Sequence, residues 1–345
     1  MKKRVLAAVL AGVMVCSLAA CGGSSGSESS DSGSGESGGE KTRVVIMPKL
    51  VGIDYYNAVE KGVNEAKEEL SDVAEIEWTG PTEATADAQI EMLSSIIATE
   101  PDVICVACND TEALAPTFKE AKDAGIKVVT WDSDSASDRD LFVDLVDYET
   151  FGNALIDDMA EQIGGAGEIA VITTSFTATN QVNWINVMEE KISSEYPDIK
   201  IATTEAVGED TQAAYEKATA LMNSNSNLKG IIALGCPNVP GVAQAVEEAG
   251  KTGEIAVVGN GLPNSVGEYI KSGVMKDSEI WNATYHGYLT VYAALQLCAD
   301  GIKEGDTVSA GSLGDFTVKS MEDGTPTIAM DILMVDKDNV DDYDF

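Results

Sequence analysis

The chain has 345 residues and a formal net charge of −36, with 58 acidic and 22 basic side chains. This length is too great for a single hydrophobic core and suffices for two lobes of ordinary size. So acidic a surface excludes nucleic acid as a partner, and it excludes strongly anionic ligands that lack a local basic pocket.

The first residues have the layout of an export signal. A basic start, Lys2 to Arg4, precedes an apolar run over residues 5–15 that is too short to anchor in a bilayer. Leu-Ala-Ala-Cys follows and ends at Cys21. We predict a signal peptide over residues 1–20. Its ending resembles the bacterial lipobox, which implies that Cys21 becomes a lipidated N-terminus; an ordinary secretory signal is the alternative.

A flexible linker is expected next, over residues 21–41. Residues 22–39 are only Gly, Ser, Glu and Asp, and such a segment cannot bury enough apolar surface to become ordered. Its reach is roughly 25 Å. A lipid followed by this tether describes a protein held at a membrane surface with its folded part free.

From residue 42 onward, short apolar runs alternate with longer helical patterns. The first series predicts strands at 44–47, 74–78, 103–107 and 126–131 and helices at 55–70, 85–99 and 111–124. The second series predicts strands at 169–173, 199–206, 230–234, 255–259 and 276–280 and helices at 151–163, 183–196, 211–223, 239–249 and 265–272. A further helix at 284–300 and short segments at 311–319 and 327–335 complete the chain. This alternation is typical of an α/β protein with parallel sheets covered by helices on both faces.

The cysteines and the histidine point to structural roles. Cys105 and Cys108 have the spacing of a redox motif, but Cys105 lies in the strand predicted at 103–107 and Cys108 directly follows it, and side chains three apart along a strand point to opposite faces. We therefore expect buried free thiols and no local disulfide. His286 stands alone near the start of a helix, and no metal-ligand cluster is present, so we expect neither a metal nor a cofactor.

Polar and aromatic side chains follow the predicted strands. Carboxyl ends of parallel strands meet at one sheet edge, where ligands bind in open α/β sheets. Carboxylates and amides make paired hydrogen bonds to sugar hydroxyls, and aromatic faces cover the C–H faces of the ring. Each residue alone is also an ordinary turn or cap residue. The set contains Lys49, Tyr55, Tyr56, Asn109, Asp110, Asp132, Asp134, Asn180, Gln181, Trp184, Cys236, Asn238, Asn260, Trp281 and Asn282.

Enzyme signatures are weak. The stretch that begins at Gly259 starts like a dinucleotide fingerprint, but Asn264 occupies the place of the third glycine. A Ser or Cys nucleophile would need a base, and His286 is the only imidazole. We expect no catalysis; the alternative is a sugar-converting enzyme with Asp132 and Asp134 as acid and base.

Five stretches along the chain carry a resemblance to a known family. They are Met-Pro-Lys-Leu-Val-Gly at 47–52, Thr-Gly-Pro-Thr at 79–82, Thr-Trp-Asp-Ser-Asp at 130–134, Asn-Gln-Val-Asn-Trp at 180–184 and Lys-Asp-Asn-Val-Asp-Asp-Tyr-Asp-Phe at 337–345. In these stretches the sequence resembles the bacterial type I periplasmic binding proteins, which are the sugar-binding components of ABC importers. Within them it is similar to the branch that contains autoinducer-2 receptors and rhamnose-binding proteins.

The resemblance implies two Rossmann-like lobes that close on a ligand around a hinge of three chain crossings. We place the crossings near Asp147, Asn282 and Thr325. The N-terminal lobe would then contain residues 42–147 and 283–325, and the C-terminal lobe residues 148–282 and 326–345. A permease with its ATPase is the implied partner, and a monomer is expected.

The ligand contacts of autoinducer-2 receptors carry over in part. Lys49, Asp132 and Gln181 match their lysine, first aspartate and glutamine. Asn180 replaces their second aspartate, Leu234 a proline and Cys236 an alanine. Residues 180–181, 261–263 and 280–282 are closer to the rhamnose-binding members. We therefore expect polar contacts from Lys49, Asp132, Asn180, Gln181 and Asn260, and walls from Tyr55, Tyr56 and Trp281.

These observations together predict a lipid-anchored receptor on the extracytoplasmic face of the bacterial cell membrane. It would capture a small neutral cyclic polyol, either autoinducer-2 or a rhamnose-like monosaccharide, for an ABC importer. A sensory receptor that signals to a membrane protein without import uses the same closure, and the sequence does not separate it from a transport protein.

Overall fold

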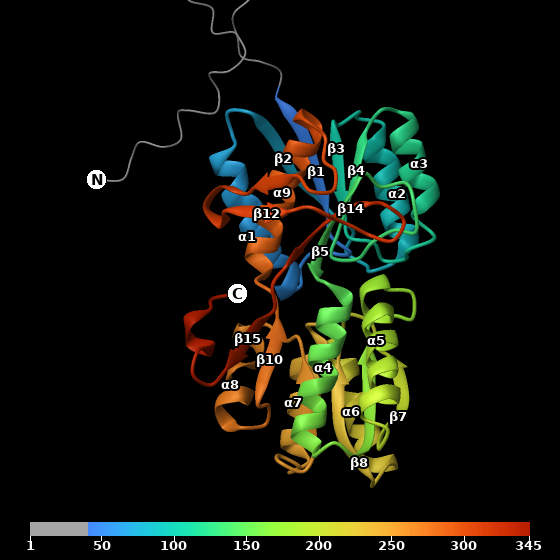
Figure 1. Ribbon diagram of the computed structural model, residues 1–345, viewed down its shortest axis with the longest axis vertical. Helices are drawn as coiled ribbons and strands as arrows, with labels where there is room; N and C mark the ends of the chain where they lie inside the picture. Colours follow the sequence, from blue (N-terminus) through green and yellow to red (C-terminus); the bar gives the residue numbers. More distant parts are fainter. Residues whose placement is uncertain (1–40) are drawn as a thin grey trace, which may run out of the picture. The chain divides into compact units, whose positions relative to one another are not determined.

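The computed structural model describes residues 41–345, in which strands and helices alternate along the chain (Figure 1). The predicted signal peptide, the lipidation site at Cys21 and nearly all of the predicted linker lie outside these residues. Within the described part of the chain, no helix is both long enough and apolar enough to cross a membrane.

The first sheet is mostly parallel and has helices on both faces. Its strands are β1 (Thr42–Met47), β2 (Ala74–Trp78), β3 (Val103–Val106), β4 (Lys127–Trp131), β5 (Leu141–Val146), β13 (Lys319–Ser320) and β14 (Pro326–Met330). Their order is β13-β14-β5-β4-β3-β1-β2, and only β13 is antiparallel to its neighbour. Helices α1 (Asp54–Glu69) and α9 (Ala283–Ala299) cover one face, and α2 (Ala86–Ile97) and α3 (Ala115–Asp123) cover the other (Figure 1).

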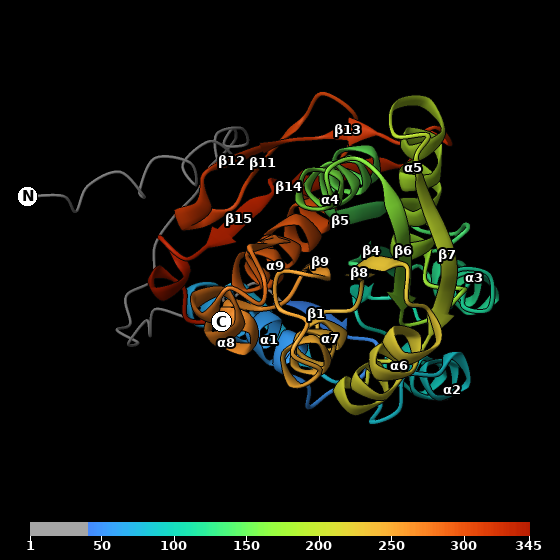
Figure 2. The same ribbon diagram turned by 90° about the horizontal axis from the view of Figure 1, so that it is seen from below.

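The second sheet repeats this plan with four parallel strands. They are β6 (Gly167–Thr173), β7 (Ile199–Ala206), β8 (Leu228–Ala233) and β9 (Ala256–Gly259), in the order β7-β6-β8-β9. Helices α4 (Tyr148–Ile163) and α5 (Thr179–Glu195) pack on one face, and α6 (Thr211–Ser224) and α7 (Asn238–Glu248) on the other, with α8 (Pro263–Ser272) beside α7 (Figure 2). Buried apolar strands covered on both faces are typical of parallel sheets.

Two antiparallel pairs and two short 3₁₀-helices complete the fold. Strand β10 (Asp277–Ile280) pairs with β15 (Leu333–Asp336), and β11 (Thr307–Ser309) pairs with β12 (Asp315–Thr317). The 3₁₀-helices are η1 (Gly311–Leu313) and η2 (Val340–Asp342). We call the first sheet with α1–α3, α9, β11 and β12 the first half, and the second sheet with α4–α8, β10 and β15 the second half.

Three segments connect the two halves. The first passes through Asp147 between β5 and α4, and the second through Asn282 between β10 and α9. Each of these residues is the N-cap of the helix that follows, because Asp147 accepts a hydrogen bond from Thr150 N and Asn282 accepts one from Tyr285 N, both at 3.0 Å. The third segment lies between β14 and β15.

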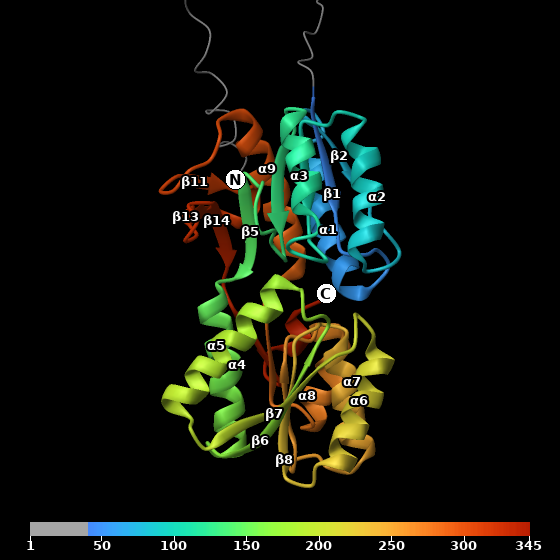
Figure 3. The same ribbon diagram turned by 90° about the vertical axis from the view of Figure 1, so that its right-hand side faces the viewer.

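The third crossing comes later than the sequence predicted. Residues 326–330 were placed in the second half, but they form β14, which pairs with β5 in the first sheet (Figure 3). That placement is wrong because the apolar run over residues 327–335 is two strands. Asp331 and Ile332 separate them, and only the later strand, β15, pairs with β10.

Two other elements differ from prediction. Strand β5 was not predicted, although all six of its residues are buried, because Asp144 interrupts its apolar run. Helix α5 begins at Thr179, four residues before the predicted start, so Asn180 and Gln181 lie in its first turn. Asn180 and Gln181, which the sequence placed before the helix, therefore lie within it, and the helix fixes the direction of their side chains.

The prediction for the cysteine pair is confirmed. Cys105 and Cys108 are free and buried, and they belong to different core clusters. Cys105 packs with the residues of α1 and α9, whereas Cys108 packs with those of α2 and α3. The two thiols thus point to opposite faces of the sheet.

Candidate functional site

The structure brings all ten predicted site residues together around one pocket between the two halves. The space that they enclose, including its mouth, is about 290 Å³. This pocket lies beyond the carboxyl ends of both sheets, where an open α/β sheet binds its ligands. The predicted residues in its lining are Lys49, Tyr55, Tyr56, Asp132, Asn180, Gln181, Leu234, Cys236, Asn260 and Trp281.

In the first half, Asp132 contacts the polar side chains of Tyr56 and Lys49 in the pocket. It follows β4 with φ +61°, a left-handed conformation that Asp and Asn adopt more readily than most residues. Its Oδ2 accepts a hydrogen bond from Tyr56 at 3.1 Å, and Lys49 Nζ lies 3.6 Å from its Oδ1. Lys49 and Asp132 are both buried. They therefore form an ion pair in which each charge compensates the other inside the protein.

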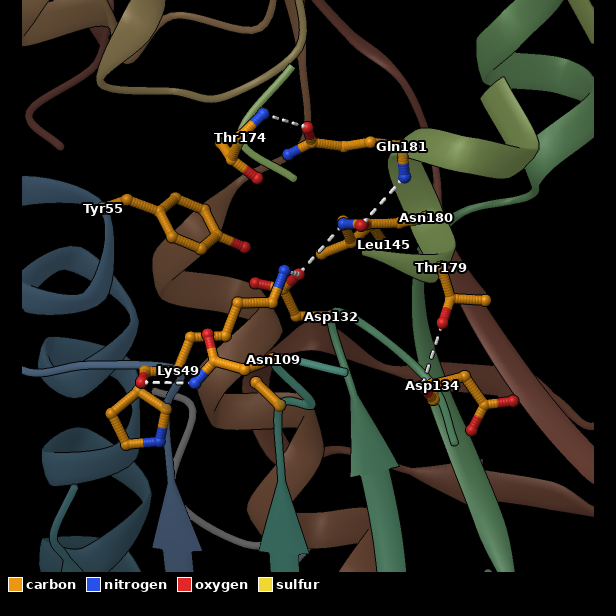
Figure 4. A network of polar contacts seen from close by, with 12 residues as sticks. Lys49, Tyr55, Asn109, Asp132, Asp134, Leu145, Thr174, Thr179, Asn180 and Gln181 are labelled. Carbon is orange, nitrogen blue, oxygen red and sulfur yellow. Dashed lines mark hydrogen bonds and ion pairs between the residues drawn. The ribbon is translucent and has the colours of Figure 1, made fainter. Parts of the chain in front are cut away.

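Lys49 is held by the loop after β1. Asn109 Nδ2 donates to the Lys49 carbonyl at 2.9 Å (Figure 4). Gln89 Nε2 donates to the carbonyls of Pro48 at 3.1 Å and Ala107 at 2.7 Å. Asn109, which the sequence listed among strand-end residues, thus fixes the loop and does not line the pocket.

The second half supplies two amides from the first turn of α5. Asn180 Nδ2 donates to Asp132 Oδ1 at 3.1 Å, so this hydrogen bond joins the two halves across the pocket. Gln181 Oε1 accepts from Thr174 N at 2.8 Å and from Thr173 Oγ1 at 2.5 Å. With its oxygen held in this way, the amide nitrogen of Gln181 points into the pocket (Figure 4).

Aromatic rings form one wall from the first half to the second. Trp281 Nε1 donates to Tyr55 OH at 3.1 Å, and the two rings meet edge to face. Trp281 also packs against Trp184 and Phe151 of the second half. The wall presents the apolar surface of the Tyr55, Trp184 and Trp281 rings to the pocket. Trp281 lies in a connecting segment and touches both halves.

The far side of the pocket comes from the ends of β8 and β9. Leu234, Cys236 and Asn260 lie there, and all three are buried. We orient the amide of Asn260 with its nitrogen toward the carbonyls of Leu234 and Ala233, at 3.0 and 3.3 Å, because the reverse orientation sets oxygen against oxygen. Burial raises the pKa of the Cys236 thiol, which is therefore protonated near neutral pH.

Five residues of the lining were not among the ten predicted to line it: Leu145, Trp184, Glu209, Gly235 and Pro237. Glu209 is the ionisable one, and burial raises its pKa to about 7. It follows β7 as the other polar residues follow their strands, so the same rule applied to the strand predicted at 199–206 would have found it. Trp184 stood in the strand-end set, without a place in the predicted lining.

Asp134 does not join Asp132 in the pocket. Its carboxylate pairs with Arg139 at 2.9 Å and accepts from Thr130 at 2.5 Å, while its backbone carbonyl accepts from Thr179 Oγ1 at 3.1 Å (Figure 4). An acid and base pair made from Asp132 and Asp134 thus has no support in the geometry. Among residues 41–345, no group of three or more His, Cys, Asp or Glu side chains is arranged to hold a metal ion.

His286 is a core residue outside the pocket. It is fully buried, its Nε2 lies 3.0 Å from the Val143 carbonyl, and its ring meets Trp131 edge to face. Burial lowers its pKa, so the ring is neutral and donates to that carbonyl. Asn238 is also structural, because it donates to the carbonyls of Gly208 and Asp210.

Comparison with known proteins places the chain in a family. Residues 44–303 match the model of the periplasmic binding protein domain. A D-ribose/D-allose-binding protein of Pseudomonas aeruginosa is 24% identical over 267 residues, which cover 75% of this chain and 83% of that protein.

Two solved structures share the architecture. A sugar ABC transporter protein from Actinomyces odontolyticus is 30% identical with a TM-score of 0.70, and the match covers 88% of this chain and 98% of that one. A solute-binding protein from Clostridium phytofermentas with bound L-rhamnose is 25% identical with a TM-score of 0.83, at the same coverage. The chain belongs to the periplasmic binding protein domain family, and its two parallel sheets joined by three segments have the type I periplasmic binding protein fold.

Proposed function

We propose that this protein captures a small neutral cyclic polyol, a rhamnose-like monosaccharide or autoinducer-2, and hands it to an ABC permease with its ATPase. The observation that carries the proposal is the pocket itself, in which Asp132 of one half and Asn180 of the other meet across a space lined by amides and aromatic rings. A related solute-binding protein holds L-rhamnose, and a related protein is named for D-ribose and D-allose.

The charges of the pocket favour a neutral guest. Lys49 is already paired with Asp132, so it offers no free positive charge to an anion. A neutral polyol instead donates hydroxyl hydrogens to the carboxylate of Asp132 and accepts hydrogen bonds from the amide nitrogens of Asn180 and Gln181. A guest that supplies these bonds can replace the direct contact between Asp132 and Asn180 without leaving either group unpaired.

A thermal-shift panel tests the proposal. L-rhamnose, D-ribose, D-allose, other monosaccharides and autoinducer-2 are added to the folded chain, and calorimetry follows each candidate that raises the midpoint. A ligand present at 100 times its Kd stabilises the folded state by about 2.7 kcal/mol. We expect at least one of these compounds to do so. If none raises the midpoint, the proposed ligand class is wrong.

We further propose that the mature protein is anchored on the outside of the cell membrane through a lipid on Cys21. The support is the sequence alone, in which Leu-Ala-Ala-Cys is followed by a Gly- and Ser-rich linker. Expressed in a bacterial host, the wild-type chain should partition into the detergent phase, and Cys21→Ser should move it to the aqueous phase. An aqueous wild-type protein would contradict the anchor without affecting the ligand proposal.

A further inference from the structure

A second chamber lies outside the pocket and shares only two residues with it. The chamber measures about 530 Å³ including its mouth, and both halves contribute to its lining. Lys49 and Glu209 line the pocket and the chamber alike. The remaining chamber residues are small or polar, and Ala84, Asn109, Thr174 and Gly208 are among them.

The two shared residues come from opposite halves. Lys49 follows β1 in the first half and Glu209 follows β7 in the second. Lys49 cannot move freely, because its ammonium group is buried beside Asp132 and its carbonyl is held by Asn109. Lys49, whose side chain is fixed, and Glu209 are therefore the two residues at which the pocket and the chamber meet.

The backbone around Glu209 is held while its side chain is not. Gly208 N donates to the Thr174 carbonyl at 3.0 Å, and the buried amide of Asn238 donates to the carbonyls of Gly208 and Asp210 at 3.0 and 3.2 Å. In the described part of the chain, the Glu209 carboxylate takes part in no hydrogen bond or ion pair. The loop thus presents this carboxylate at the boundary without using it to hold the fold.

We propose that Glu209 is a specificity-determining residue, which with Lys49 separates the ligand pocket from the outer chamber and limits the pocket to a guest of monosaccharide size. The chamber has the polar lining that suits the substituent or second ring of a larger glycoside, but the Glu209 side chain excludes that group. This inference rests on the proposed function.

Thiol labelling tests whether Glu209 separates the pocket from the chamber, and this test does not require the ligand to be known. Cys236 lines the pocket and does not line the chamber, so a reagent that enters through the chamber must pass Glu209. Labelling by N-ethylmaleimide at a fixed alkaline pH is followed at each cysteine by mass spectrometry. Glu209→Ala should label Cys236 several-fold faster than Glu209→Gln, which keeps the length of the side chain. Fully buried Cys105 reports any general loosening of the fold.

A second substitution tests whether the labelling reagent reaches Cys236 through the chamber. Ala84 is exposed and lines only the chamber, so Ala84→Trp narrows it without touching the pocket. Added to Glu209→Ala, it should return the labelling rate of Cys236 toward that of Glu209→Gln. Equal rates in Glu209→Ala and Glu209→Gln would overturn the partition, and so would a rate that Ala84→Trp leaves unchanged.

Ligand size tests the same inference by binding. L-rhamnose and its mono-O-methyl ethers, one for each hydroxyl, are titrated into the wild-type chain and both Glu209 variants. At least one ether rejected by the wild-type chain and by Glu209→Gln should gain about tenfold or more in affinity for Glu209→Ala. An identical ether profile in the two variants overturns the inference. Failure of L-rhamnose itself to bind counts against the rhamnose form of the proposed function, and the labelling result then decides the partition.

Discussion

At the scale of single residues, Asp132 joins the two halves at the pocket through its hydrogen bond with Asn180. One of its oxygens faces Lys49 and Asn180, and the other accepts from Tyr56. Its left-handed backbone at the end of β4 turns the side chain into the pocket. Substitution by Asn keeps a residue that tolerates this conformation, so it separates the loss of charge from backbone strain.

We predict that Asp132→Asn weakens ligand binding by about tenfold or more, because the amide supplies one acceptor where the carboxylate supplies two. Lys49 also loses its partner, so the free energy of unfolding should fall by about 3 kcal/mol. Calorimetry with the identified ligand measures the first effect and urea unfolding the second.

Asp134→Asn is the matched control for this change. It breaks the buried pair between Asp134 and Arg139, whose side chains are only 3% and 6% exposed, yet neither residue lines the pocket. Asp134→Asn should also lose stability, although less than Asp132→Asn because Arg139 keeps Asp323 as a partner at 2.7 Å, while its ligand affinity stays near that of the wild-type chain. Equal loss of affinity in both variants would remove Asp132 from the list of ligand contacts.

The protonation of Glu209 should make the stability of the folded protein depend on pH. Burial raises the pKa of Glu209 from 4.5 to about 7, so the folded state holds its proton more tightly than the unfolded state. A raised pKa contributes stability that is full below 4.5 and is lost as the pH rises toward 7. Glu209→Gln mimics the protonated form. Its melting temperature should therefore match that of the wild-type chain at low pH and exceed it above neutrality. A constant difference across that range would contradict the burial of this carboxyl.

At the scale of elements, helices α1 and α9 cross at two glycines. A Cβ on Gly62 would lie 1.8 Å from the Thr284 carbonyl oxygen, and one on Gly287 would lie 2.2 Å from the Val59 carbonyl oxygen. Both neighbours are backbone atoms of the opposite helix, so they cannot turn aside. The helix that follows the second crossing is thereby held close to the helix that carries Tyr55 and Tyr56.

We predict that Gly62→Ala destabilises the protein by about 2 kcal/mol or more, because the helices must separate to admit the new methyl group. Helix propensity alone predicts the opposite sign, a gain of about 1 kcal/mol for Gly to Ala. Glu65→Ala, on the exposed face of the same helix, is the control and should change stability little. Denaturant unfolding gives both values, and a stabilised Gly62→Ala would show that the crossing is loose.

The helices and strands were predictable where the local sequence indicated both the type of element and its two ends. Strand 199–206 was predicted with its observed bounds, because its apolar and β-branched residues end at clear turn residues. Strand β5 was not predicted, since only tertiary contacts show that its Asp144 is buried beside apolar neighbours. The start of α5 was also misplaced, because its N-cap, Ala178, makes no side-chain cap and gives no sequence signal.

A single rule predicted most of the site residues, but the same rule also selected residues that hold the fold. The strand-end rule brought together Lys49, Asp132 and Asn260 from β1, β4 and β9. It does not tell which strand-end residues are used to hold the fold. Asp134 and Asn238 make structural contacts, and Glu209 lines the pocket in a loop that resembles an ordinary turn.

At the scale of the whole molecule, polar contacts hold the two halves of the hinged protein together. Thr179 of the second half donates to the Asp134 carbonyl and also contacts Thr111 of the first half, beside the bond between Asn180 and Asp132. A guest that bonds to both halves leaves the contacts of Thr179 in place and replaces the single bond between Asp132 and Asn180 with several of its own, so it shifts the hinge further toward the closed arrangement.

We predict that a saturating ligand lowers the radius of gyration of the protein, measured by small-angle scattering. Asn180→Ala removes one of the bonds between the halves, so without ligand its radius should exceed that of the wild-type chain. Asn264→Ala is a surface control, because Asn264 contacts the chain end and does not line the pocket. Superimposable scattering profiles with and without ligand would argue against closure.

The place of β14 in the first sheet and of β15 beside β10 has a consequence for biosynthesis. Neither half is encoded by one continuous stretch, so during synthesis each half must wait for a strand that comes after α9, which is β14 in the first half and β15 in the second. Residues 148–282, expressed as a fragment, should therefore aggregate or remain unfolded, because β10 would lack its partner. The four-stranded second sheet can form once Gly259 has been made, whereas the first sheet stays incomplete until β14, which comes after α9, has been made.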